Sequence, residues 1–118
     1  SSARRTLETL DQVRPRIPGK PQLSIEKELY LSSAEDLMKR LRKVDRAVGS
    51  VLLLGHNPGL EDLARLLFGK QKSEAVDGLN AKYPTGGLAT FTMDIDSWKD
   101  LKAGGASLQS FVIPKGLV

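Results

Sequence analysis

The sequence predicts an α/β domain in which helices cover both faces of a mixed, mainly parallel sheet, a three-layer α/β/α sandwich. Helix-like and strand-like segments alternate along most of the 118 residues. The apolar run at 51–54 is typical of a strand covered on both faces, as parallel strands are. The last two strand-like segments are close enough in sequence to pair as antiparallel neighbours. With 40% hydrophobic and 27% charged residues, the chain is predicted to form one domain spanning 1–118.

The first half of the chain predicts two helices separated by an extended segment. Residues 1–13 form the first, with Leu7 and Leu10 at three-residue spacing and prolines at positions 15, 18 and 21 to end it. A short strand or extended segment is predicted over 23–31. The pair Ser32-Ser33, followed by Glu35 and Asp36, is typical of a helix N-cap. The second helix is predicted over 34–48, with one apolar side formed by Leu37, Leu41, Val44 and Val48.

The second half begins with the buried strand at 51–54. Asn57 is predicted to cap the following helix, with Pro58 in its first turn and Gly69 at its end. Residues 69–84 are polar and predict a surface loop. Strands are then predicted over 88–93 and 108–113, with a turn or short helix between them at 94–101.

His56 is the chain's one histidine, and it lies where the predicted strand leads into a helix. Open α/β sheets bind ligands at such junctions, and a helix N-terminus attracts anions. A histidine placed there can hydrogen-bond a phosphate or carboxylate. The alternative is a structural histidine without a chemical role, and the junction alone leaves both interpretations open.

The composition narrows the possible chemistry. Without cysteine there is no disulfide or thiolate nucleophile, and a single histidine disfavours a zinc site. No Gly-x-Ser-x-Gly segment supports a serine nucleophile. The apolar runs are too short to span a bilayer, so no membrane association is expected and a cytoplasmic location fits best. The basic residues between 39 and 46 lack interleaved aromatic residues, which favours a solvated helix face over nucleic-acid binding.

Three stretches in a fixed order resemble the histidine phosphatase superfamily, in its SixA-type phosphohistidine phosphatase branch. Residues 1–9 are similar to the family's Ser-Pro-x-x-Arg-Ala-x-Gln-Thr segment, with Ser2 and Glu8 departing from it. The other two stretches are 54–60, Leu-Gly-His-Asn-Pro-Gly-Leu, and 84–89, Pro-Thr-Gly-Gly-Leu-Ala. The C-terminal stretch, from Trp98 through 111–115, also resembles the C-terminal stretch of these proteins. The family's N-terminal Arg-His-Gly motif, which carries the phosphoryl-accepting histidine, has no counterpart in these residues.

The resemblance implies a phosphoglycerate mutase-like fold lacking its N-terminal strand, and a chain that is the C-terminal portion of a longer protein. It assigns catalytic roles to Arg5 and His56, and substrate binding to Asn57, Thr85 and, more loosely, Glu28. The implied reaction removes a phosphoryl group from phosphohistidine, another phosphoprotein or a small phosphate ester, through a phosphohistidine intermediate without metal or cofactor. The 118 residues alone are expected to be inactive.

Two alternatives stay open beside the phosphatase. A non-catalytic domain that binds phosphate or phosphoproteins would keep Arg5 and His56 without a nucleophile. A basic, nucleic-acid-associated module would use the net charge of +4 and the helix at 34–48, and it is the least favoured. The natural substrate and the oligomeric state are left open.

Overall fold

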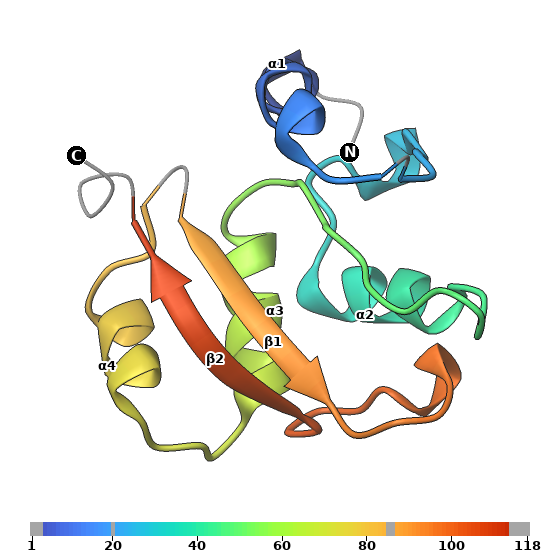
Figure 1. Ribbon diagram of the computed structural model, residues 1–118. Helices are drawn as coiled ribbons and strands as arrows, with labels where there is room; N and C mark the ends of the chain where they lie inside the picture. Colours follow the sequence, from blue (N-terminus) through green and yellow to red (C-terminus); the bar gives the residue numbers. More distant parts are fainter. Residues whose placement is uncertain (1–3, 20, 85–86, 114–118) are drawn as a thin grey trace.

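The computed structural model describes residues 4–19, 21–84 and 87–113. Its helices and strands are arranged as Figure 1 shows. The α-helices of this part of the chain are α1 (Arg4–Val13), α2 (Ala34–Arg42), α3 (Gly59–Phe68) and α4 (Glu74–Ala81). Its strands are β1 (Leu88–Met93) and β2 (Ala106–Val112). Three short 3₁₀ turns complete it: η1 (Arg14–Arg16), η2 (Lys27–Leu29) and η3 (Trp98–Asp100).

The predicted three-layer sandwich is wrong for this chain. The sheet of the described residues has two antiparallel strands, β1 and β2, and no parallel pair. The segment 51–54, expected as a central strand, is irregular and lies outside the sheet. Val51 and Leu52 are 40% and 48% exposed. A parallel strand is part of a sheet covered on both faces, and the sheet of the described residues consists of β1 and β2.

Two further segments differ from the prediction. Residues 23–31 form no strand and contain η2 instead. The helix predicted over 34–48 ends at Arg42, six residues early. Beyond it the Asp45 carboxylate accepts a hydrogen bond from the backbone N–H of Ala47 at 2.8 Å, a local turn that competes with continued helix. At the end of the predicted helix, the Val48 carbonyl accepts a hydrogen bond from Trp98 Nε1 at 2.8 Å, which connects this segment to η3.

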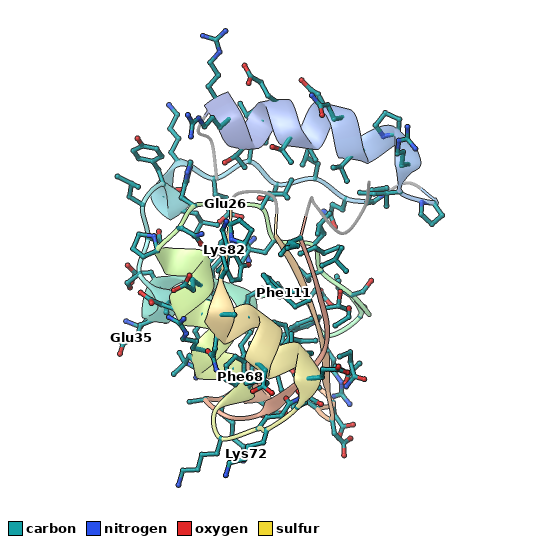
Figure 2. All side chains as sticks on the ribbon, turned by 90° about the vertical axis from the view of Figure 1, so that its left-hand side faces the viewer. Glu26, Glu35, Phe68, Lys72, Lys82 and Phe111 are labelled. Carbon is teal, nitrogen blue, oxygen red and sulfur yellow. The ribbon has the colours of Figure 1, made fainter. Side chains whose placement is uncertain are left out.

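The predicted surface loop at 69–84 contains a helix, α4. Ser73 caps it by accepting a hydrogen bond from the Val76 N–H at 3.2 Å. Val76 and Leu79, three residues apart, turn the same face inward, and Leu79 has no exposed surface. Figure 2 shows Phe68 of α3 beside this helix, while Lys72, just before it, extends away from the body. The loop prediction therefore missed a core element.

The hydrophobic core is organised around α3, which packs on two sides. One cluster joins it to α2 and to the start of β2, through Leu37, Met38, Leu41, Leu63, Leu67, Leu101 and Ala106. The other joins it to α4 and β2, through Ala64, Phe68, Val76, Leu79 and Leu108. Fully burying a Leu, Val, Met or Phe side chain contributes about 1.5–3 kcal/mol relative to leaving it exposed, and α3 takes part in both clusters.

Several local predictions are confirmed. Ser33 caps α2, accepting a hydrogen bond from the Asp36 N–H at 3.2 Å. α3 ends before Gly69, whose φ of +56° suits glycine. β1 has the predicted bounds, and it pairs with β2 from Leu88↔Val112 to Met93↔Ala106, with an irregularity between Thr90 and Phe91.

The helix predicted at the start of the chain is also present, as α1. It lies apart from the main body at the top of Figures 1 and 2. Thr6 is its buried side chain, whereas Leu7, Leu10 and Val13 are half-buried. Among the described residues, no helix has the length and apolar character needed to cross a membrane.

Candidate functional site

His56 lies in the turn that leads into α3. Its backbone carbonyl accepts a hydrogen bond from the Leu60 N–H at 2.9 Å, and Pro58 occupies the N-cap position. The predicted cap by Asn57 is wrong, because no side chain caps this helix. Asn57 Nδ2 instead donates to the Tyr83 carbonyl at 3.2 Å, which ties the turn to the segment before β1. Two hydrogen bonds therefore hold the backbone that carries the imidazole, one to the first turn of α3 and one to the segment before β1.

Gly59 brings a second segment of the chain against this turn. A Cβ atom at Gly59 would overlap the carbonyl oxygen of Ser32, so the two backbones approach closely only because glycine stands there. The approach places Tyr30 beside His56, with the ring centroids 5.4 Å apart and the planes at 84°. This edge-to-face arrangement restricts how the imidazole can turn. Sequence analysis did not identify Tyr30, because its contact with His56 depends on the close approach at Gly59.

Thr6 provides the link between α1 and the turn. Its Oγ1 lies 3.4 Å from His56 Nε2, across 50 positions of sequence, and its side chain is buried. The hydroxyl donates when Nε2 is unprotonated and accepts when Nε2 carries the proton. Thr6 adjoins Arg5, so the contact that holds the imidazole also fixes the helix turn that carries the guanidinium. Sequence analysis missed this residue.

Arg5 and His56 line the same cavity, of about 1110 Å³. Asn57 lines it as well, together with β1 and the segment 48–57. A second cavity of about 270 Å³, lined by residues 31–33 and by the first turn of α3, meets the large one at His56 and Asn57. The two groups predicted to act together thus come from separate elements, one on α1 and one before α3, and face a shared space.

Tyr83 is another member of the cavity wall, next to the Asn57 contact. Burial raises the pKa of its phenol, and the negative charge of Glu61 raises it further. The ring also packs against Phe111, with centroids 5.1 Å apart. Tyr83 is therefore a neutral hydroxyl at neutral pH that donates or accepts a hydrogen bond without adding charge.

The two remaining site predictions have different outcomes. Glu28 lies exposed on η2 and lines neither cavity, although its carbonyl accepts from Ser32 Oγ at 2.8 Å and so supports the segment carrying Tyr30. Thr85 lies outside the described residues. Within the part of the chain that the structure covers, no three histidine or carboxylate side chains gather in a way that could hold a metal ion.

Comparison with known proteins places the chain beside proteins of mycobacteria. It is 25% identical over 116 residues to an uncharacterized protein of Mycobacterium leprae, a match that covers 98% of this chain and 69% of the relative. It is 27% identical over 89 residues to an uncharacterized protein of Mycobacterium tuberculosis, covering 74% of this chain and 56% of the relative. The chain thus spans between about half and about two thirds of these relatives. No family model and no solved structure matches it.

Proposed function

We propose that the chain carries half of a phosphoryl-transfer site of the histidine phosphatase type, in which Arg5 and His56 hold the phosphoryl group. The observation that carries the proposal is that both side chains line one cavity although they lie 51 positions apart. A guanidinium offers a planar set of donors for phosphate oxygens, and an imidazole adds a further donor when protonated. Arg5 is exposed and His56 is half-buried, so partial exclusion of water strengthens the interaction with an anion mainly at His56.

The reaction needs a nucleophile that these 118 residues do not contain, because their one histidine is assigned to binding. In the proposed mechanism a histidine from further polypeptide accepts the phosphoryl group, the bond to the leaving group breaks, and water then hydrolyses the phosphoenzyme. Arg5 and His56 stabilise the negative charge on the transferring oxygens. The substrate is phosphohistidine, another phosphoprotein or a small phosphate ester, and the location is the cytoplasm.

The test is release of inorganic phosphate from a phosphohistidine peptide by the natural full-length polypeptide. Arg5→Ala and His56→Ala are each expected to lower the rate by about 100-fold or more, the usual effect of removing a charge-stabilising donor. Arg4→Ala is the matched control, because Arg4 is 93% exposed and pairs with Glu8 at 3.0 Å. It should keep normal turnover. Near-normal turnover in Arg5→Ala, or an equal loss in Arg4→Ala, would contradict the assignment.

The second candidate is a domain that binds phosphorylated ligands without catalysis, and the single histidine is the observation that favours it. The mass of the natural polypeptide separates the two at the first step. A mass of 12.9 kDa, that of these 118 residues, favours the binding domain, and a larger one leaves room for the nucleophile. Binding of the phosphohistidine peptide without phosphate release identifies the binding domain directly.

A further inference from the structure

We propose that Thr6 is a positioning residue for His56. Its hydroxyl donates to Nε2 and so keeps the proton of the neutral imidazole on Nδ1, where the ring offers an N–H donor to a phosphate oxygen without carrying a charge. The inference rests on the proposed function, because the anion is the one that Arg5 and His56 are proposed to hold. Thr6 acts through His56 and does not itself contact the phosphoryl group.

The contact between the two side chains is made inside the protein. Thr6 Oγ1 lies 3.4 Å from His56 Nε2, and Thr6 is 7% exposed. Figure 1 shows α1, which carries Thr6, above the segment that leads into α3. Since a buried hydroxyl without an acceptor costs free energy, the Thr6 proton needs a partner in this position.

Thr9, one turn later on α1, makes a different hydrogen bond. Both threonines line the large cavity. The Thr9 hydroxyl donates to the carbonyl of Arg5, four residues earlier, at 3.0 Å, as threonines within helices commonly do. Within the described part of the chain, the Thr6 hydroxyl has no such carbonyl partner and contacts His56 Nε2 instead. The acceptor for the Thr6 proton is therefore the imidazole.

Nδ1 is the ring nitrogen that remains for a ligand. Among the described residues, the hydrogen bond of the His56 side chain is the one to Thr6. These residues contain no buried side-chain nitrogen that lacks a partner, and His56 is half-buried. Nδ1 is therefore accessible, and the ring lines both cavities, including the one that it shares with Arg5.

The states of the two ring nitrogens are coupled. A neutral imidazole carries one N–H and one lone pair, and the hydrogen bond made by one nitrogen decides the state of the other. Donation by Thr6 to Nε2 leaves the proton on Nδ1, which then donates to an anion. In the other tautomer Nδ1 would present a lone pair that repels phosphate, and the buried Thr6 hydroxyl would lose its acceptor. One proton position thus satisfies both the hydroxyl and the anion.

The first test reads the proton position from the nitrogen NMR shifts of the chain's one histidine, in alkaline solution without phosphate. In the wild type, Nδ1 should have the shift of a protonated nitrogen and Nε2 that of an unprotonated one. Thr6→Ser keeps the hydroxyl and should keep this order. Thr6→Val has nearly the same shape without a hydroxyl, so the difference between the two shifts should shrink or reverse. Thr9→Val, the matched control on the same helix, should leave the shifts unchanged.

Two outcomes of this test would overturn the inference. One is a wild type with the proton on Nε2, and the other is a Thr6→Val protein with the same nitrogen shifts as the wild type. The amide resonances of α1 report whether Thr6→Val keeps the helix. If the helix is lost, the wild-type proton position decides, because the inference requires it to be Nδ1.

The second test titrates inorganic phosphate into the same proteins in alkaline solution and follows the ring resonances of His56. Phosphate should bind Thr6→Val at least about 10-fold more weakly than Thr6→Ser, because a hydrogen bond to a charged group is among the stronger ones. Equal affinity in the two variants would overturn the inference and leave the proposed anion site of Arg5 and His56 intact. No response in the wild type would refute that anion site, and with it the role of Nδ1 as a donor.

Discussion

Gly59→Ala is the substitution whose effect the structure specifies best. The added Cβ would overlap the Ser32 carbonyl oxygen, a backbone atom that moves only with its whole segment. Overpacking of this kind costs typically about 1–3 kcal/mol, which exceeds the gain of up to about 1 kcal/mol from replacing glycine by alanine in a helix. We therefore expect a net destabilisation of about 1–2 kcal/mol in urea unfolding, and displacement of Tyr30 from His56.

Gly78→Ala is the matched control for this prediction. Gly78 lies within α4, and a Cβ there meets no atom within 4 Å. The same chemical change should stabilise the protein by about 0.5–1 kcal/mol, because alanine loses less backbone entropy in a helix. The His56 ring resonances, shifted by the nearby Tyr30 ring, should move in Gly59→Ala and stay in Gly78→Ala. A Gly59→Ala protein as stable as the wild type would refute the close approach that builds the site.

The core and one ion pair give two further predictions. Leu79→Ala should lower the free energy of unfolding by about 2–5 kcal/mol in chemical denaturation, because Leu79 is completely buried, whereas a loss below about 1 kcal/mol would mean that α4 does not belong to the core. Glu26 accepts a hydrogen bond from Arg40 Nε at 2.5 Å, which lowers the pKa of its carboxyl in the folded state. Its stabilising effect is therefore present above the unfolded-state pKa and is lost as the pH falls through the folded-state value. Wild type should be more stable than Glu26→Gln by about 0.5–1 kcal/mol at pH 7, and this difference should close as the pH falls below the ordinary glutamate pKa of 4.5. A difference that is constant with pH would contradict the pairing.

The elements that the sequence predicts well are those whose signals and partners are local. α3 has four apolar positions at helical spacing and a glycine at its end, and both features are found in the structure. β1 is predicted with its correct bounds because its composition is typical of a strand, and it pairs with β2 as the antiparallel neighbour expected. Ser33 caps α2 through a hydrogen bond from the N–H of Asp36, only three residues later in the sequence.

The elements that the sequence predicts poorly depend on distant partners. The run at 51–54 has the composition of a buried strand, yet a strand exists only where another strand can pair with it. α4 lies in a polar stretch, and its core role becomes visible only when Val76 and Leu79 meet α3 and β2. The early end of α2 follows from the turn made by Asp45, which helical periodicity does not reveal.

The residues of the candidate site also fall into those that local sequence motifs identify and those that depend on distant contacts. Arg5 and His56 could be named from the sequence, because short motifs in a fixed order carry them, and the structure places both on one cavity. Thr6 and Tyr30 could not, since their contacts with His56 join segments far apart in the chain. The predicted cap by Asn57 is wrong because Pro58 takes the N-cap position and the amide turns to the Tyr83 carbonyl.

The single histidine makes the proposed anion site of Arg5 and His56 directly testable by NMR, because one imidazole gives one set of ring resonances. Inorganic phosphate should shift these resonances saturably in the wild-type chain and in Arg4→Ala, and should leave them unmoved in Arg5→Ala. Two results would contradict joint binding of phosphate by the two side chains. One is that phosphate does not shift the His56 resonances of the wild type, and the other is that it shifts them equally in Arg5→Ala.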